Sequence, residues 1–309
     1  MKTRGRRVRI LAYLAALGCA ALVLAEIGLR LKGFGDPPLH HLDAKIEYYA
    51  KQGSYRRHGN FVQVNAFGMR GEPVRPRGTQ LRVLLLGDSI VFGTYRVGQD
   101  ELISTSLEPE LARLSKRDVE VLNVACSSWG PENQLGYLER FGSFDADAVV
   151  WVLSSHDAYD VPVPGFAELL PREPRALALG EVYDLYWQKR FKPPPPTGDP
   201  LARSLKAVER IVARFRKEGL PLLVVHHWSE TELGRGMDEE GLRLDALFDS
   251  LDVPVFSLKS VLLSAREKGK NPLQDPLHLS PDGARATGTA IAHELVRRGM
   301  HLEKSAGTW

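Results

Sequence analysis

Leu81-Arg-Val-Leu-Leu-Leu-Gly-Asp-Ser-Ile90 is the stretch that decides the fold. An unbroken apolar run from Val83 to Leu86 stops at Gly87-Asp88-Ser89. Such a run is typical of a strand that is buried on both faces, and the glycine predicts a sharp turn at its end. Ligands of open α/β sheets bind just beyond the carboxyl ends of the strands, so Ser89 is expected where chemistry takes place.

A serine in this position needs a base before it can act as a nucleophile. The chain offers one in Asp275-Pro-Leu-His278, which is followed by Leu-Ser-Pro-Asp-Gly283. An Asp and a His three residues apart in a short turn can aim both side chains at one site. The imidazole of His278 would take the serine proton, and the carboxylate of Asp275 would orient the ring.

Together these stretches resemble two sequence blocks of the SGNH (GDSL) hydrolases. Gly87-Asp88-Ser89 resembles their first block, and Asp275-Pro-Leu-His278, about 190 residues further on, resembles the D-x-x-H of their last block. Asn65-Ala-Phe-Gly-Met-Arg-Gly71 resembles an N-x-x-G-x-R-G segment that precedes the catalytic strand in many membrane-anchored bacterial SGNH-like proteins. The resemblance covers about residues 60–300 and implies a flavodoxin-like serine esterase. By itself, the segment at 65–71 predicts a turn that packs under the domain.

From residue 81 onward, apolar runs alternate with amphipathic segments. Strands are expected over residues 83–86, 119–124, 148–153, 220–226 and 253–258, and helices over 101–115, 133–141, 201–217, 242–251 and 281–298. This alternation predicts a three-layer α/β/α sandwich with a parallel five-stranded sheet. Residues 158–200 interrupt it with several prolines and with Tyr183, Tyr186 and Trp187. They form either a lid over the substrate or a passive surface loop.

Between these two blocks the SGNH family has a second and a third block, and the second departs from the family pattern in this chain. The chain reads Asn123-Val-Ala-Cys-Ser-Ser-Trp-Gly130 after the second strand. In SGNH proteins a glycine five residues after the Asn supplies a backbone N–H to the oxyanion hole, and here Ser128 occupies that place. A backbone donor does not require glycine. The resemblance therefore implies that Ser128 donates together with the N–H of Ser89, and Gly130 is a second candidate; a simple turn is the alternative.

The third block departs as well. Where the family has G-x-N-D, this chain has Ser154-Ser155-His156-Asp157. An imidazole can donate an N–H, so His156 could keep the oxyanion role of the Asn. Asp157 would hold the turn and orient His156, and Asp88 and Asn123 are expected to support the site. The substitution leaves open an altered reaction, such as acyl transfer, or a weakened site.

The N-terminus predicts a membrane segment. Five basic residues lie among the first nine, and an apolar or small run from Ile10 to Ala25 follows. This is a signal-anchor helix or a cleaved signal peptide. The pattern continues through Leu31, which favours a retained anchor over cleavage at Val23-Leu24-Ala25 and a periplasmic or secreted product. With the basic cluster inside, the rest of the chain faces outward. The expected division is a tail and transmembrane helix over 1–31, a connector over 32–80 and a hydrolase-like domain over 81–300.

Composition narrows the partners and cofactors. A hydrophobic content of 43% and a charged content of 26% are typical of a globular enzyme, and a net charge of +3 is too small to indicate nucleic acid. Cys19 and Cys126 are not expected to pair. His226 and His227 end the fourth strand and are expected to be structural or to line the substrate site. No HExxH, paired cysteines, carboxylate cluster or glycine-rich nucleotide loop is present, so no cofactor or metal is expected.

Three functions remain open at this stage. The first is a membrane-anchored esterase or deacylase that acts on an acylated, in particular O-acetylated, envelope glycan or a similar small ester. The second is an O-acyltransferase of envelope polysaccharide. The third is a binding module built on a degraded SGNH domain. Intact Ser89, Asp275 and His278 favour an enzyme, whereas His156 and Ser128 favour the module.

Overall fold

The computed structural model of the protein describes residues 2–188, 190 and 194–300. Its central sheet has five parallel strands in the order β6-β5-β7-β8-β9. They are β5 (Leu81–Gly87), β6 (Val119–Ala125), β7 (Ala148–Leu153), β8 (Leu222–His226) and β9 (Val255–Ser257). Every residue of β5, β7 and β8 is buried, as a strand covered on both faces requires. In chain order the strands run 2-1-3-4-5, the order of a flavodoxin-like sheet.

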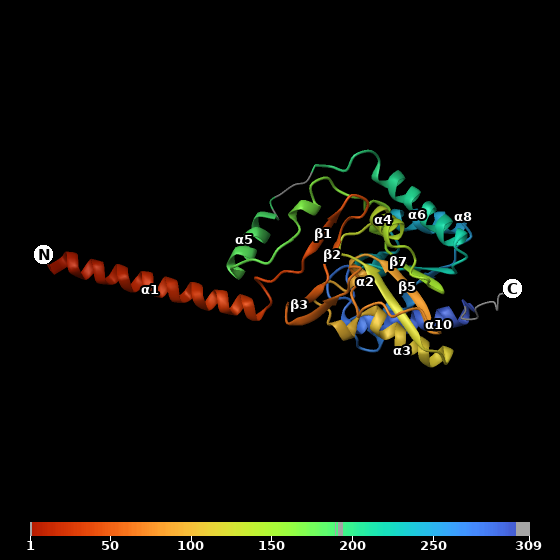
Figure 1. The fold of residues 1–309 in the computed structure, drawn as a ribbon, viewed down its shortest axis with the longest axis horizontal. Coiled ribbons are helices and arrows are strands. Elements are labelled where there is room, and N and C mark those ends of the chain that lie inside the picture. Colours follow the sequence, from red (N-terminus) through yellow and green to blue (C-terminus); the bar gives the residue numbers. More distant parts are fainter. Residues whose placement is uncertain (1, 189, 191–193, 301–309) are drawn as a thin grey trace.

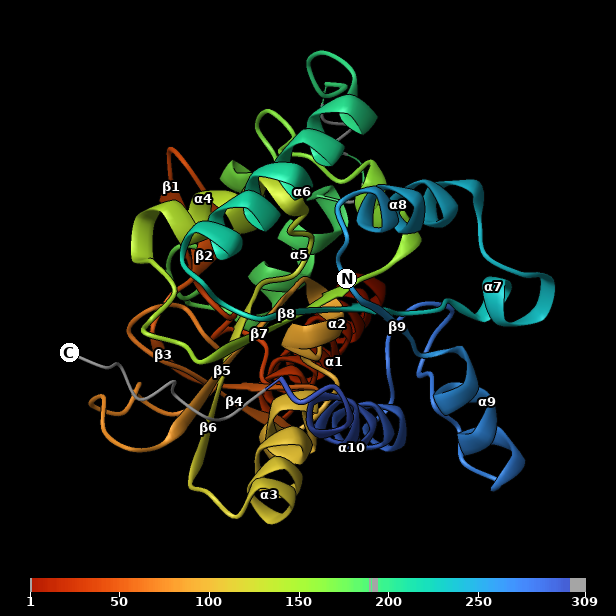
Figure 2. The same ribbon diagram turned by 90° about the vertical axis from the view of Figure 1, so that its right-hand side faces the viewer.

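Helices cover both faces of this sheet (Figure 2). One face carries α3 (Ile103–Ser115), α9 (Lys259–Glu267) and α10 (Pro281–Arg297), and the other carries α4 (Pro131–Phe141), α6 (Pro200–Lys217) and α8 (Glu239–Ser250). α6 shows why these segments are helical, because Val208, Ile211 and Phe215 recur on one face and are all buried. The predicted three-layer α/β/α sandwich is therefore confirmed.

The sequence analysis did not predict several helices. They are α2 (Ser89–Phe92), α5 (Ala178–Gln188), α7 (Glu230–Arg235), α9 and three 3-10 helices, η1 (Gln99–Glu101), η2 (Ser155–Ala158) and η3 (Ala167–Leu169). α7 did carry a signal, since Ser229 and Glu232 form a capping box at its start. The shortest of the others have too few turns for a periodic pattern to emerge.

Residues 32–80 contain two antiparallel hairpins rather than a plain connector. β1 (His40–Asp43) pairs with β2 (Glu47–Ala50), and β3 (Gly53–Arg57) pairs with β4 (Asn60–Val64). The first hairpin packs on the loop that follows β6. Tyr48 Oη donates to the Ser127 carbonyl at 2.7 Å, and Trp129 Nε1 donates to the Tyr48 carbonyl at 2.9 Å. This segment thus buttresses the carboxyl edge of the sheet.

α1 (Lys2–Leu31) projects away from the rest of the protein (Figure 1). Among the residues that the structure describes, it is the one helix long and apolar enough to cross a membrane, over Val8–Leu31. A signal sequence has the same properties. Residues 158–200 include α5 (Ala178–Gln188), which lies beside the end of α1 that joins the globular part. Closure of this insertion over the site stays a prediction.

Candidate active site

Ser89 occupies the turn between β5 and α2. The turn requires glycine at position 87, because a Cβ atom there would lie only 2.5 Å from Val91 Cγ2. Asp88 caps α2, its Oδ1 accepting from the Ile90 N–H at 2.8 Å. Asp88 and Ile90 are buried whereas Ser89 is partly exposed. The local sequence therefore presents one hydroxyl at the carboxyl edge of the sheet.

Ser89, His278 and Asp275 form a continuous hydrogen-bonded series. Ser89 Oγ lies 3.0 Å from His278 Nε2, and His278 Nδ1 lies 2.9 Å from Asp275 Oδ2. A carboxylate can only accept, so Nδ1 carries the proton and Nε2 of the neutral ring accepts from the serine hydroxyl. The structure thus brings these three predicted residues together from opposite ends of the folded region, in the arrangement of a nucleophile, a base and an orienting carboxylate.

The loop that carries His278 is fixed from two sides. Asp275 Oδ1 accepts from the N–H groups of Leu277 and His278 at 3.0 and 2.8 Å. Although burial opposes it, these donors lower the pKa of the Asp275 carboxyl. From behind, His227 Nε2 donates to the Leu277 carbonyl at 2.7 Å. Burial lowers the pKa of His227 to about 4, so its ring is neutral and serves to hold this loop.

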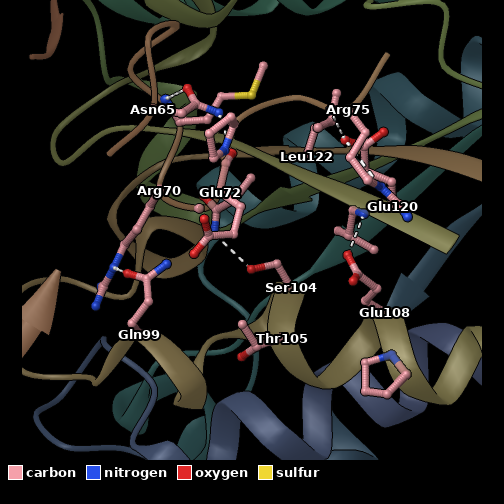
Figure 3. A pocket seen from close by; sticks show the side chains of 16 residues that line it. Asn65, Arg70, Glu72, Arg75, Gln99, Ser104, Thr105, Glu108, Glu120 and Leu122 are labelled. Carbon is pink, nitrogen blue, oxygen red and sulfur yellow. Dashed lines mark hydrogen bonds and ion pairs between the residues drawn. The ribbon is translucent and has the colours of Figure 1, made fainter. Parts of the chain in front are cut away.

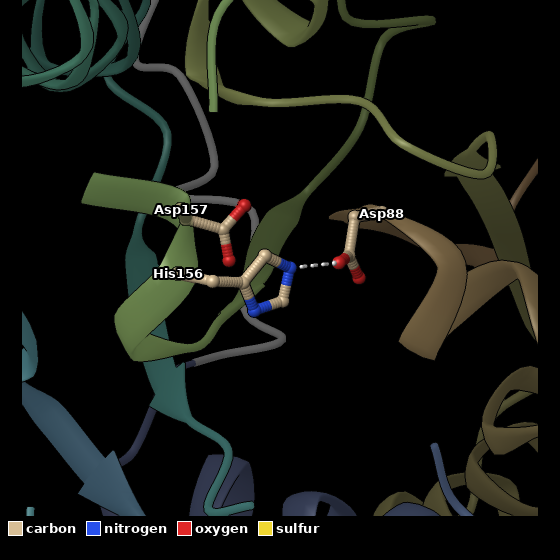
Figure 4. A group of neighbouring side chains, drawn as sticks. All are labelled: Asp88, His156 and Asp157. Atoms are coloured by element: carbon tan, nitrogen blue, oxygen red, sulfur yellow. Dashed lines mark hydrogen bonds and ion pairs between the residues drawn. The ribbon is translucent and has the colours of Figure 1, made fainter. Parts of the chain in front are cut away.

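A second histidine stands at the same edge, in η2 after β7 (Figure 4). His156 Nε2 lies 3.2 Å from Asp88 Oδ2 and 3.4 Å from Asp160 Oδ2. Its Nδ1 lies 2.7 Å from Ser154 Oγ. Asp157 completes the turn by accepting from the Ser154 N–H at 2.8 Å. Both ring nitrogens of His156 are therefore engaged by groups of the protein itself.

Charge in this cluster is set by burial and by the three carboxylates. Burial disfavours a charged His156, but Asp157, Asp88 and Asp160 outweigh it and raise the pKa of the ring to about 10. At neutral pH His156 is consequently a cation. Burial also opposes ionisation of Asp88, yet the bond to His156 lowers the pKa of this carboxyl. Burial raises the pKa of Asp160 to about 6 and that of Asp157 well above its usual range.

Asp88, His156 and Asp157 also have the residue types of a metal site. One possible ligand atom of each lies within 4.8 Å of the others. Metal motifs read from local spacing do not reveal this group, because its members follow two different strands. Both ring nitrogens of His156 already face protein groups, with Ser154 Oγ at Nδ1 and the carboxyl groups of Asp88 and Asp160 at Nε2. These contacts account for the group as a hydrogen-bonded cluster of the protein itself.

The two candidate backbone donors after β6 differ. Ser128 is exposed and has a φ of 60°, in the left-handed region. The N–H of Gly130 donates to Asn133 Oδ1 at 3.0 Å, and a Cβ atom at Gly130 would lie 1.9 Å from the Asp160 carbonyl oxygen. Close packing against Asp160 thus accounts for this glycine, and its N–H already has a partner.

Two further predicted residues hold α2 and the loop after it. Asn123 is buried, and its Nδ2 donates to the Val91 carbonyl at 2.9 Å. Arg70, from the N-x-x-G-x-R-G segment, is buried and donates to the carbonyls of Phe92 and Thr94 at 2.7 and 2.6 Å. As the sequence predicts, the segment is a packed turn; it also underlies the chain just beyond Ser89.

Arg70 and Asn123 also line a cavity of about 380 Å³ between α3, β6 and residues 65–75 (Figure 3). Glu72, Glu108 and Glu120 line it too. Burial raises the pKa of Glu108, whose carboxylate accepts from the Val121 N–H at 2.9 Å. Ser89 and His278 are not among the residues that line this cavity, so it is distinct from the hydrogen-bonded series.

No protein-family model and no curated protein sequence matches the chain. Solved structures are similar to it at low identity. A lipase/acylhydrolase from Enterococcus faecalis is 16% identical, with 70% of this chain and 96% of that chain covered and a TM-score of 0.46. A member of the lipolytic G-D-S-L family from Veillonella parvula is 13% identical, with 70% and 98% covered and a TM-score of 0.42. The acetyl xylan esterase AlAXEase is 14% identical, with 70% and 98% covered and a TM-score of 0.46.

Proposed function

We propose that the protein is a serine hydrolase of the SGNH (GDSL) type that cleaves acyl esters through an acyl-serine intermediate. The observation that carries this proposal is the hydrogen-bonded series from Ser89 through His278 to Asp275 at the carboxyl edge of the sheet. A partly exposed serine bonded to an imidazole nitrogen that can accept its proton, with the ring oriented by a carboxylate, is an activated nucleophile.

The reaction follows from the atoms in contact. Ser89 Oγ attacks the ester carbonyl while His278 Nε2 removes the hydroxyl proton. The same nitrogen returns the proton to the leaving alkoxide, which leaves an acyl group on Ser89. Water then attacks the acyl-serine with His278 again acting as base. Asp275 keeps the proton on Nδ1 and stabilises the imidazolium that forms in each half of the cycle.

The negative charge that develops on the carbonyl oxygen needs donors. We assign this role to the backbone N–H groups of Ser89 and Ser128, each contributing about 3 kcal/mol if it matches known oxyanion donors. Gly130 is left out because its N–H is bonded to Asn133. The N–H groups of His156 are directed at Asp88 and Ser154, so we assign it a positive charge beside the site rather than a direct hydrogen bond.

The substrate we propose is an O-acylated, in particular O-acetylated, envelope glycan or a similar ester. Support comes from α1, in which a cluster of basic residues is followed by an apolar stretch that is exposed along its length. Retained as a signal anchor, it would hold the hydrolase on the outer side of the membrane, where such esters occur. A sugar hydroxyl that replaced water in the second step would make the same acyl-enzyme an acyltransferase.

Ester turnover by the full chain in detergent tests the proposal. The wild type is expected to hydrolyse p-nitrophenyl acetate and to release acetate from an O-acetylated oligosaccharide. Ser89→Ala should lower turnover by about 10⁴-fold without changing the circular dichroism spectrum, because only the nucleophile is removed. Ser250→Ala, at an exposed serine of α8, is the matched control. Turnover by Ser89→Ala at the wild-type level would refute the assignment.

A further inference from the structure

α5 presents an apolar and aromatic face that is largely exposed among the residues that the structure describes. Tyr183 is 62% exposed, and Tyr186 and Trp187 are each 51% exposed. Val182 and Tyr186 lie four residues apart, as do Tyr183 and Trp187, so these four side chains form one stripe along the helix. The opposite side is anchored, since Ala178 and Glu181 are buried. An exposed patch this rich in aromatic rings is typical of a surface that binds a partner or a membrane.

The position of α5 is fixed by the end of the apolar run of α1. Glu26 directly follows that run, and its carboxylate accepts from the N–H groups of Ala178 and Leu179 at 2.9 and 3.0 Å. Arg30 donates to the Ala176 carbonyl at 2.6 Å. α5 therefore starts beside the last two turns of α1, at the end that joins the globular part. Figure 1 shows α5 at the edge of the globular part on the side from which α1 projects, running across the direction of α1.

Contacts from the globular part secure the same element. Glu181 Oε2 accepts from the Gly35 N–H at 2.6 Å, and Glu181 Oε1 pairs with Arg57 at 2.5 Å. Both carboxylate oxygens of this buried residue thus tie α5 to the chain that leads from α1 to β3. The helix cannot turn its exposed stripe away without breaking a buried ion pair, which is costly.

We propose that α5 is a second membrane contact, an interfacial helix whose Tyr183–Trp187 stripe lies among the lipid headgroups of the bilayer that α1 crosses. The proposal rests on the retained anchor under Proposed function. Tyr and Trp are enriched at this level of a bilayer because their rings are apolar and their polar ends are wet. Arg190, whose guanidinium lies 3.6 Å over the Tyr186 ring, adds a positive charge suited to lipid phosphate. With both α1 and α5 in contact with the bilayer, the orientation of the globular part would be fixed, and with it the orientation of the sheet edge that bears Ser89 relative to the membrane.

Site-specific fluorescence in lipid nanodiscs tests this contact with the full chain. Cys19→Ala removes the exposed thiol, whereas Cys126 is buried and burial raises its pKa to about 12, so it does not compete for label. Single NBD labels are then placed at Tyr183→Cys on α5, at Ala15→Cys within α1 and at Leu242→Cys, an exposed apolar position of α8. Nanodiscs of phosphatidylcholine and phosphatidylglycerol are prepared with and without doxyl-labelled lipid.

The labels at 15 and 183 are expected to be quenched by the doxyl lipid, with quenching at 183 at least about twofold that at 242. If the label at 15 is quenched but the label at 183 is quenched no more than the label at 242, the interfacial role of α5 is overturned and the anchor stands. Absence of quenching at 15 would overturn the anchor and this contact together. Ester turnover of the labelled proteins is measured in parallel, so a failure of the contact is separable from a failure of the hydrolase assignment.

Discussion

Two histidines stand at the carboxyl edge of the same sheet with their partners in different places. His278 has one carboxylate, at Nδ1, and a serine hydroxyl at Nε2. His156 has a serine hydroxyl at Nδ1 and the carboxylates of Asp88 and Asp160 facing Nε2. The residue types are nearly the same in both groups, and only the arrangement differs.

That arrangement decides what each ring can do. With Asp275 holding the proton on Nδ1, His278 keeps a lone pair on Nε2 that points at Ser89 and can take its proton. His156 is surrounded by carboxylates that raise its pKa to about 10, so it already holds both protons and cannot serve as a base at neutral pH. A His near a Ser and an Asp is thus not by itself a catalytic base.

The largest expected effect is the loss of esterase activity when the His278 ring is removed. His278→Ala should reduce kcat/KM for ester hydrolysis by about 10⁴-fold, because it removes the imidazole that is hydrogen-bonded to Ser89 Oγ. His293→Ala, which removes an exposed imidazole of α10, is the matched control and should leave kcat/KM unchanged. A loss below tenfold at position 278 would mean that another group is the base.

A smaller effect is expected at the second ring. His156→Ala should lower kcat about tenfold, because it removes a charge near the site and no direct oxyanion donor. His156→Asn should behave alike, since the assigned role needs the positive charge. Steady-state kinetics of both variants on one ester check this. Full recovery by the Asn variant alone would instead indicate that position 156 donates an N–H to the oxyanion.

The smallest expected effect concerns stability and pH. Because the pKa of His156 rises from an ordinary 6.5 to about 10 on folding, its stabilisation is complete below pH 6.5 and fades as pH rises toward 10. The difference in Tm between the wild type and His156→Asn should therefore be greatest near pH 6 and shrink by pH 10. Thermal melts across this range measure it. A gap that stays constant or widens toward pH 10 would contradict the cationic assignment.

The hydrogen-bonded series of Ser89, His278 and Asp275 could be predicted from sequence because its signals are local. The apolar run before Gly87 marks a buried strand, the glycine marks the turn, and three-residue spacing places Asp275 within reach of the His278 ring. Parallel sheets bring strand ends to one edge, which joins the two distant stretches. Apolar runs are also local signals, and their alternation with amphipathic segments predicted all five strands of the sheet.

The contacts of the second cluster could be predicted only in part. The sequence places His156 beside Asp157 and at the same edge as Asp88, but which atoms meet depends on tertiary packing. Asp160 and Ser154 reach His156 through the turn after β7, and Asp88 reaches it from the neighbouring strand. Nothing in the spacing of Gly130 showed that its N–H bonds to Asn133. The hairpins in 32–80 were missed because their strands are short and half exposed.

Covalent labelling of the intact protein by a fluorophosphonate tests most directly whether His278 activates Ser89. Peptide mass spectrometry of the wild type should find the phosphonate on Ser89, and His278→Ala should label at least about 10³-fold more slowly because its serine keeps the proton. A wild type that stays unlabelled at Ser89 while folded, or equal labelling rates with and without the imidazole, would contradict the account.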